Sequence, residues 1–304
     1  MTDISFIIVN WNTRDLLLAC LDSVYKTLRG IPFEIWLVDN GSSDGSVTAA
    51  KERFPGIHVI ENPANLGFAA AVNLALERLK GRYAVLLNTD AALTEGAVNR
   101  LYDFMQANPM VGIACGQLLN RDGSRQNSIA NFPSLLSLAS NETLLRLLFP
   151  RRFPSKRREY TGPIEVDSCI GACMMVRKEA VDRVGPLDER YFFFMEETDW
   201  AYRMKRAGWK ICFVPSARIY HAQGKSAAAR ADARILFYRS RYVYFKKWRP
   251  GSYALICVII FSRLLINTAI SLLGVGLTLG LKRNLNRRLV MYAQLIAWHM
   301  KGCP

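Results

Sequence analysis

The sequence has 304 residues, of which 51% are hydrophobic, so it can bury the core of one large domain or of two modest ones. Its formal net charge is +15, and the charge is uneven: residues 1–200 carry 21 Lys and Arg against 24 Asp and Glu, whereas residues 201–304 carry 19 against a single acid, Asp232. Basic tails contact either nucleic acid or anionic membranes, and because this tail is also the most apolar part of the chain, we expect an anionic membrane lipid as partner and no nucleic acid.

The cysteines and the N-terminus indicate a cytoplasmic setting. The 7 cysteines are odd in number and form no CxxC pair, which is typical of reduced thiols in the cytosol. The start of the chain, MTDISFIIVNW, has no basic residue before its apolar run. It therefore predicts a first strand rather than a signal peptide.

The first ninety residues alternate between two kinds of segment. Short apolar runs rich in β-branched residues predict strands at Ile4–Val9, Glu34–Val38, His58–Ile60 and Tyr83–Leu87. Helical patterns lie between them at Leu16–Leu28, Ser46–Phe54 and Phe68–Leu79. This order predicts an α/β fold, a Rossmann-like and mostly parallel sheet flanked by helices.

Polar residues follow each of these predicted strands. They are Asn10-Trp11-Asn12, Asp39-Asn40-Gly41, Glu61-Asn62 and Asn88-Thr89-Asp90. In open α/β sheets, ligands bind beyond the carboxyl ends of the strands. We therefore expect a binding site for a metal, a ribose or a base at this edge.

Residues 120–163 interrupt the alternation. They contain DGSRQNS, Phe-Pro pairs and the basic run Arg151–Arg158. Loops of this length in compact domains are functional or disordered, so we expect a long mobile excursion here. Regular structure is expected again from Val166 to Tyr220.

The C-terminal region predicts a membrane-associating helical tail at 251–304, after a first domain at 1–250. Tyr253–Leu281 is almost uninterruptedly apolar and has basic residues on both sides. It exceeds the roughly 20 residues that a membrane-spanning helix needs. Arg263 and Asn267 disfavour a simple span. A span, an interfacial helix and a buried helical pair that caps the first domain therefore all remain open.

Asp90 is the first candidate for chemistry. A carboxylate at a strand end is a natural ligand for Mg²⁺, which takes one or two protein oxygens and completes its shell with phosphate and water. The alternative is an ordinary turn in which Asp90 makes local backbone hydrogen bonds.

An acidic cluster is the second candidate. Glu196, Glu197 and Asp199 follow the aromatic run Tyr191–Phe194 directly. Crowding and an apolar wall both raise carboxyl pKa values toward the range of a general base. The alternative is the first turn of a helix, where acids favour the macrodipole.

Two weaker signals remain. His221 follows a strand-like run and is either a metal ligand or a structural histidine. The segment ENPANLGFAAAVNLAL opens a helix with a Gly-containing turn, which favours phosphate, although it matches neither the dinucleotide fingerprint nor the P-loop. An ordinary strand-to-helix turn explains it equally well.

Taken in order, seven segments resemble glycosyltransferase family 2, and more narrowly its bacterial rhamnosyltransferase-like branch. They are IIVNWN, VDNGSSDGS, NLGFAAAVN, LLNTD, DGSRQNS with FPS, GACMMVRKEAVDRVGPLDERYFFFMEETDWAYRMKRAGW, and VPSARIYHAQGKS. The resemblance covers about residues 3–226 and implies the GT-A fold.

The resemblance also implies a role for each matching residue. Those that would bind the nucleotide-sugar are Asn10, Trp11, Asp39, Asn65, Gly67 and Asn88. Asp90 would hold a divalent metal, Mg²⁺ or Mn²⁺, with His221 nearby, and Glu197 would be the general base. The family's DxD motif is NTD here, so Asn88 replaces its first acid. The family's ED pair is EE, so the base is one methylene longer and Glu196 competes for the role.

The implied activity is an inverting transfer of a sugar from a nucleotide-sugar donor to a glycan or polyprenyl-linked acceptor. The resemblance favours dTDP-rhamnose as donor, cell-surface polysaccharide as product and the cytoplasmic face of a bacterial inner membrane as location. Two alternatives are a nucleotidylyltransferase, which would need a Gly-rich basic loop where this chain has VNWNTRD, and a non-catalytic membrane scaffold that retains the fold.

Overall fold

The computed structural model describes residues 2–140, 142–150, 152–154, 158–222 and 231–302. These residues form two compact units, each built from two stretches of the chain. The first unit combines Met1–Phe132 with Pro150–Ser226, and the second combines Pro133–Phe149 with Ala227–Pro304. The second unit thus includes part of the excursion expected at 120–163. The domain boundary at 250 stays a prediction.

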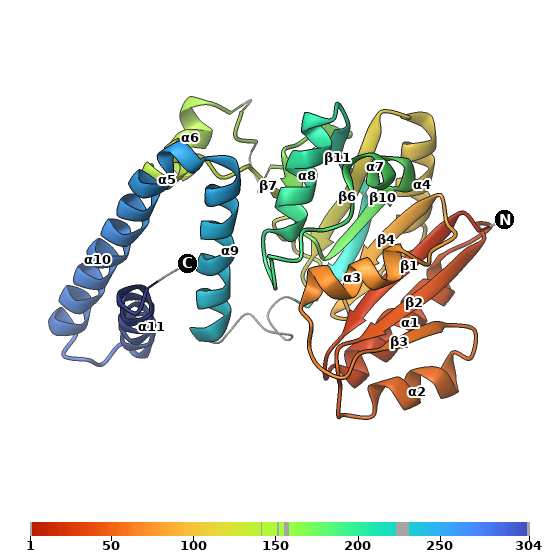
Figure 1. Cartoon of the computed structure of the whole chain (residues 1–304), viewed down its shortest axis with the longest axis horizontal. Helices are drawn as coiled ribbons and strands as arrows, with labels where there is room; N and C mark the ends of the chain where they lie inside the picture. The colour runs from red at the N-terminus through yellow and green to blue at the C-terminus, as the bar shows by residue number, and fades with distance from the viewer. Residues whose placement is uncertain (1, 141, 151, 155–157, 223–230, 303–304) are drawn as a thin grey trace. The chain divides into compact units, whose positions relative to one another are not determined.

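The first unit contains the parallel strands expected from the sequence. These are β1 (Ile4–Asn10), β2 (Phe33–Asp39), β3 (His58–Glu61) and β4 (Tyr83–Leu87). β1 lies between β2 and β4 and pairs parallel with both, and β3 extends the sheet beyond β2 (Figure 1). From β1 the chain therefore first adds β2 and β3 on one side, and then adds β4 on the other side of β1. This reversal places a crevice beyond the carboxyl ends of β1 and β4.

The rest of this sheet is mixed. Its further strands are β5 (Ala91–Leu93), β6 (Val111–Leu119), β8 (Ile164–Glu165), β10 (Cys173–Arg177) and β11 (Lys210–His221). Among the described residues the sheet has 9 strands, in the order β3-β2-β1-β4-β10-β6-β11-β5, with β8 beside β11. β10 is antiparallel to both neighbours. A small separate ladder joins β7 (Ile129–Ala130) to β9 (Ser168–Cys169).

Helices cover both faces of the sheet, as the alternating pattern predicts. One apolar core lies under α1 (Arg14–Thr27), α2 (Ser46–Arg53) and α4 (Ala97–Ala107). The other lies under α3 (Phe68–Leu76), α7 (Lys178–Val184) and α8 (Glu196–Arg206). In α1 the fully buried Leu17, Leu21 and Val24 recur at helical spacing. Each such side chain contributes about 1.5–3 kcal/mol by leaving water.

The second unit is helical. Its elements are α5 (Leu135–Ala139), α6 (Glu142–Leu148), α9 (Ala231–Trp248), the 3₁₀ turn η1 (Pro250–Ser252), α10 (Tyr253–Leu277) and α11 (Arg283–Met300). α10 packs along α11 and also contacts α5 and α9 (Figure 1). The Nε2 atom of His299 in α11 and the Tyr242 hydroxyl of α9 form a hydrogen bond at 2.8 Å. The apolar stretch predicted from Tyr253 onward is therefore a helix with partners of its own.

Candidate active site

Asp39 is held at the end of β2 by the side chain that ends β1. The Asn10 amide donates to Asp39 Oδ1 at 2.7 Å and also contacts the hydroxyls of Ser42 and Ser46 at 3.0 and 2.8 Å. The Ser42 N–H donates to Asp39 Oδ2 at 2.8 Å. Asn10 is completely buried, and its hydrogen bond orients the Asp39 carboxylate. Ser42 and Ser46 were not singled out from the sequence, although VDNGSSDGS contains both.

An open hollow of about 320 Å³ lies beside Asp39 and is called the β2 hollow below. Its lining comes from the end of β2, the turn that follows, α2 and the last residue of β3: Asp39, Ser42, Gly45, Ser46, Val47, Thr48, Lys51, Glu52 and Glu61. Of the residues predicted from the sequence, Asp39 lines it. Trp11, the first residue after β1, is 49% exposed, which is unusual for so large an aromatic ring.

The turn before α3 is tied to the same edge. The Asn40 amide donates to Asn65 Oδ1 at 3.2 Å and to the Gly67 carbonyl at 3.1 Å, and Asn65 Oδ1 also accepts the Gly67 N–H at 2.9 Å. Gly67 has φ +87°, and a Cβ there would lie 2.6 Å from the carbonyl oxygen of Phe192. Only glycine fits such a position.

Asp90 and His221 come together through the pairing of β5 with β11. Ala91 lies opposite His221 in that ladder. The Nε2 atom of His221 is 3.4 Å from Asp90 Oδ1, and the Ala222 N–H donates to the Asp90 carbonyl at 2.9 Å. Both side chains are almost fully buried. The structure therefore joins two of the residues predicted to hold a metal.

Gln126 determines which nitrogen of His221 carries a proton. Its Nε2 donates to the His221 carbonyl at 2.6 Å, so its Oε1 is the atom 3.0 Å from His221 Nδ1. Because that oxygen can only accept, Nδ1 must donate. The sequence contains Gln126 within DGSRQNS, but nothing in its spacing indicated a partner 95 residues away.

This arrangement fits a divalent cation. With Nδ1 protonated, a neutral His221 directs the lone pair of Nε2 toward the Asp90 carboxylate, so a proton or a cation has to lie between them. Imidazole nitrogen and carboxylate oxygen are both ligands of Mn²⁺, and Mg²⁺ is held by one or two carboxylates together with phosphate. Within the described ranges no group of three or more His, Cys, Asp and Glu is placed to hold a metal.

The acidic cluster follows a strained turn. Phe194 and Met195 have φ of 71° and 73°, a conformation that side chains of this size rarely adopt. The carbonyl of Phe192, two residues earlier, accepts the Phe68 N–H at 2.8 Å and so ties the turn to the start of α3. Strain of this kind persists only where the surrounding structure enforces it, and it clusters at functional sites.

Burial raises the pKa of both residues that begin α8. For Glu196, which is 6% exposed, burial and then the neighbouring charge of Glu197 raise the pKa well above its ordinary value. Burial raises the pKa of Glu197 to about 7, while hydrogen bonds from backbone N–H groups act in the opposite direction. Burial therefore favours the protonated form of both carboxyls, and Glu197, whose pKa lies near neutrality, is suited to accept a proton.

The third acid of the cluster has a structural role. Asp199 is completely buried and forms an ion pair with Arg203 one helical turn later, at 3.0 Å. Its other oxygen accepts the Tyr191 hydroxyl at 3.3 Å. Arg203 in turn donates to the carbonyls of Val184 and Pro186. This part of the cluster thus fits the helix-turn alternative.

Gly171 and Ala172 connect Glu197 to the end of β4. A Cβ added at Gly171 would meet Glu197 Cγ at 3.7 Å, so the base candidate lies against this backbone. The next residue, Ala172, accepts the N–H of Asn88 at 2.9 Å. Glu197 therefore lies close to the Asn88–Asp90 turn. The sequence did not indicate this role for Gly171.

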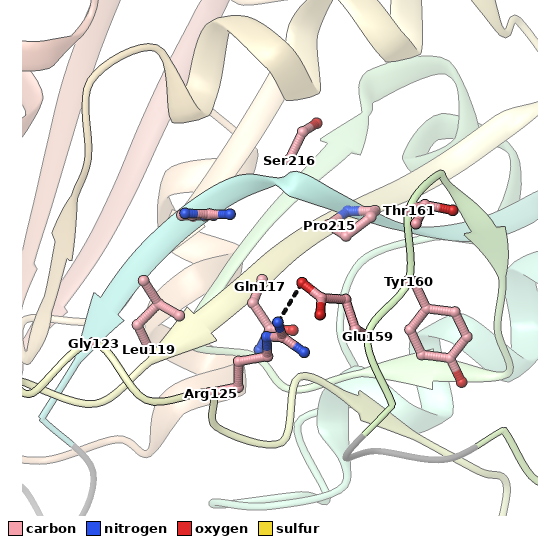
Figure 2. Close-up of a pocket in the computed structure, with 10 residues that line it drawn as sticks. Gln117, Leu119, Gly123, Arg125, Glu159, Tyr160, Thr161, Pro215 and Ser216 are labelled. Atoms are coloured by element: carbon pink, nitrogen blue, oxygen red, sulfur yellow. Dashed lines mark ion pairs between the residues drawn. The ribbon is translucent and has the colours of Figure 1, made fainter.

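A second hollow, about 440 Å³ in volume, lies beside the end of β6 and the middle of β11. Its lining includes Arg125 and Glu159, whose side chains point toward one another and form an ion pair (Figure 2). Both are substantially exposed. Exposed pairs of this kind contribute about 0–1 kcal/mol, and none of the residues predicted from the sequence lines this hollow.

Residues 5–185 match the protein family described as glycosyl transferase family 2. The N-acetylglucosaminyl-diphospho-decaprenol L-rhamnosyltransferase of Mycobacterium tuberculosis is 30% identical over 236 residues, which cover 72% of this chain and 76% of the relative. A low-salt glycan biosynthesis hexosyltransferase of Haloferax volcanii is 27% identical over 212 residues, covering 68% of this chain and 62% of its own length.

Two solved structures share the fold at 18% identity. The mannosyltransferase PcManGT of Pyrobaculum calidifontis, in complex with GDP-Man and Mn²⁺, has a TM-score of 0.59 and covers 99% of this chain and 88% of its own. GalNAc-T7 with UDP, GalNAc and Mn²⁺ has a TM-score of 0.60 over 83% of this chain, which spans about half (52%) of that larger protein. These matches confirm the predicted GT-A fold. By its sequence matches, the chain belongs to glycosyl transferase family 2, in the rhamnosyltransferase-like branch, and is a glycosyltransferase.

Proposed function

We propose that this glycosyltransferase moves a sugar from a nucleotide-sugar donor to a polyprenyl-linked glycan acceptor, with inversion at the anomeric carbon, at the cytoplasmic face of a bacterial inner membrane. Family 2 relatives support a place in glycan or lipid-linked glycan biosynthesis. The name of the M. tuberculosis relative, an L-rhamnosyltransferase with an N-acetylglucosaminyl-diphospho-decaprenol acceptor, supports L-rhamnose as the transferred sugar, and the resemblance to the family's rhamnosyltransferase-like branch favours dTDP-rhamnose as its donor.

The β2 hollow is the proposed site of the donor's nucleoside. Asp39 would accept hydrogen bonds from the base, because each of its oxygens keeps a lone pair after the bonds from Asn10 and Ser42. The exposed ring of Trp11 would cover the base or the ribose. Asn65 and Gly67 would line the nucleotide on the side of α3.

Asp90 and His221 are the proposed ligands of Mg²⁺ or Mn²⁺ on the donor diphosphate, with Asn88 beside them. When bound, the metal would act as a Lewis acid that stabilises the departing diphosphate. The buried pair of Asp90 and His221 at 3.4 Å supports this assignment. Both solved neighbours contain Mn²⁺ together with a nucleotide or a nucleotide-sugar.

Glu197 is the proposed general base. It would take the proton of the acceptor hydroxyl while that oxygen attacks the anomeric carbon, and the nucleoside diphosphate would leave with the bonding electrons. No covalent enzyme intermediate is required. The observation that carries the proposal is the position of Glu197: its pKa is raised to about 7, and it lies against Gly171, one residue from the backbone that binds Asn88.

The test is a donor screen with purified full-length protein. Thermal shift with dTDP-rhamnose, UDP-N-acetylglucosamine, UDP-glucose and GDP-mannose, each with and without Mn²⁺, identifies the nucleotide; saturation at a hundred times Kd adds about 2.7 kcal/mol of stability. Sugar transfer to a polyprenyl-diphosphate-linked N-acetylglucosamine is then measured. A protein that binds no nucleotide-sugar would be a scaffold. One that exchanges pyrophosphate into nucleotide-sugars would be a nucleotidylyltransferase.

A further inference from the structure

Composition leaves the membrane relationship of α10 undecided. The stretch Pro250–Leu277 is long and apolar enough to cross a bilayer. Its most apolar 18 residues have a mean hydropathy of 2.2, and 22% of them are buried. Large apolar side chains are exposed along its length, namely Leu255, Val258, Leu265, Ile266, Ile270, Leu272, Leu273 and Leu277. At 1.5 Å per residue the helix is about 38 Å long, so it could span the membrane or lie along it.

A contact of Arg263 limits how α10 can lie relative to a membrane. This residue lies near the middle of α10, and its guanidinium donates to the Leu138 carbonyl in α5. Leu138 is 1% exposed, and Ile260 and Leu264 beside Arg263 are also buried. α5 therefore contacts α10 near its midpoint, while Arg263 itself remains exposed.

That short helix cannot easily lie at the centre of a bilayer. α5 is 5 residues long and depends on Ser134 and Ser137 for its N-terminal capping box. Residues 132 and 150, which flank the segment 133–149, both belong to the first unit. If α10 spanned the membrane, this segment would have to enter the hydrocarbon to about half its depth and leave it again. Irregular backbone is not tolerated there when it faces lipid.

The same segment adds to the exposed apolar surface instead. Leu136 of α5 and Leu144, Leu147, Leu148 and Phe149 in and after α6 are all exposed. The second unit is also strongly basic: it carries 14 Lys and Arg against Glu142 and Asp232. A surface that combines exposed leucines with excess positive charge matches the headgroup and upper acyl region of an anionic bilayer.

We propose that the second unit is a monotopic anchor. In it α10 lies in the plane of an anionic membrane surface and does not cross it, and α5, α6 and α10 together insert their exposed leucines. This inference rests on the proposed function for the location of the membrane-linked acceptor. Of the three arrangements that the sequence left open, a span, an interfacial helix and a cap on the first domain, it selects the interfacial helix.

The first test is topological. Full-length protein, with Cys257 and Cys303 replaced by Ser, is bound to preformed vesicles of 70% phosphatidylcholine and 30% phosphatidylglycerol. Asn284→Cys, exposed at the start of α11, and Lys26→Cys, exposed on α1, are labelled with a membrane-impermeant maleimide. Both are expected to react equally without detergent. Labelling of Asn284→Cys that requires detergent would show that α10 spans the bilayer and would overturn the proposal.

The second test is energetic and uses a matched control. The double variant Leu272→Glu, Leu273→Glu is expected to lower the partition coefficient onto these vesicles by at least about tenfold, because each Glu removes an inserted side chain and repels the anionic surface. Met110→Glu, with similar exposure in the first unit, is expected to leave it unchanged. Equal binding by all three proteins, or a stable dimer that ignores vesicles, would contradict the anchor.

The proposed function and the proposed membrane anchor can be contradicted independently of each other. Hydrolysis of the donor in solution is expected to be unaffected by Leu272→Glu, Leu273→Glu. A protein that is anchored in plane but inert toward every nucleotide-sugar would refute the function and leave the anchor intact. An active protein whose Asn284→Cys is shielded by the bilayer would refute the anchor alone.

Discussion

The side-chain amide of Gln126 fixes the tautomer of His221, because it donates to the His221 carbonyl and accepts from Nδ1–H. In the neutral ring the Nε2 atom, which faces Asp90, therefore keeps its lone pair. Outer partners of this kind typically change metal affinity by about 10–100-fold when they are removed.

Gln126→Met is therefore expected to weaken Mn²⁺ binding by about 10–100-fold, measured by electron paramagnetic resonance with nucleoside diphosphate present. Gln117→Met is the matched control, since Gln117 donates to the Gln126 carbonyl and to Ser128 in the same region. If both variants weaken Mn²⁺ equally, Gln126 acts on the fold and not on His221.

Asp90→Asn is expected to abolish metal-dependent binding of the nucleoside diphosphate, because the amide carries no charge to hold a hard cation. Isothermal titration with and without Mn²⁺ measures this. Wild-type protein should lose transfer in excess chelator and regain it with Mn²⁺. Full transfer in chelator would show that no metal is needed.

Glu197→Gln is expected to lower kcat by about 10²–10⁴-fold, the usual share of general base catalysis, with little change in donor affinity. Glu196→Gln should retain activity, because the proposed base is Glu197 and burial already favours the protonated form of Glu196. Single-turnover transfer assays distinguish the two variants. An inactive Glu196→Gln beside an active Glu197→Gln would move the base by one residue.

The pH dependence follows from the same group. Burial raises the pKa of Glu197 to about 7, so the basic form increases as the pH rises through 7. We expect kcat to fall about tenfold per unit below pH 6 and to level off above pH 8. The residual rate of Glu197→Gln should lack this rise. A wild-type profile that is flat between pH 6 and 8 would exclude Glu197 as the titrating base.

Gly67→Ala is expected to be more destabilising than Gly30→Ala. Both glycines have positive φ, but a Cβ at Gly30 meets nothing within 4 Å, whereas one at Gly67 would collide with the backbone of Phe192. Gly67 also has ψ 176°, in a region essentially confined to glycine, so the excess measured in urea unfolding reports this backbone conformation together with the collision. Donor affinity should also fall in Gly67→Ala alone. Equal unfolding energies would mean that the turn before α8 moves freely.

The alternation of apolar patterns predicted β1 to β4 and α1 to α3 to within a few residues, because these elements are neighbours in the chain. The resemblance to family 2 identified Asp39, Asp90, Glu197 and His221 as site candidates. The sequence did not predict the tertiary contacts that orient these side chains. Gln126 lies 95 residues from His221, and β10 enters the sheet antiparallel between β4 and β6. Such partners are set by tertiary pairing, which local periodicity does not report.

The excursion expected at 120–163 is the clearest difference. Its sequence indicated a mobile loop, yet it contains β7, α5 and α6. α5 is short and owes its position to α10, 114 residues later in the chain. A five-residue helix has too little sequence of its own to show a period, and isolated helices of that length are unstable.

The joining of α5 to α10 also has a consequence for biosynthesis. At about 5–20 residues per second, the ribosome completes α5 roughly 6–23 seconds before the first residue of α10 is made. During that interval Leu138, which is buried in the finished protein, lacks its neighbour α10. The last strands of the catalytic sheet, β8, β10 and β11, are translated in the same interval. Docking of α10 on α5 therefore follows synthesis of every strand of the catalytic sheet, and a nascent chain stalled before residue 253 would leave Leu138 exposed to chaperones.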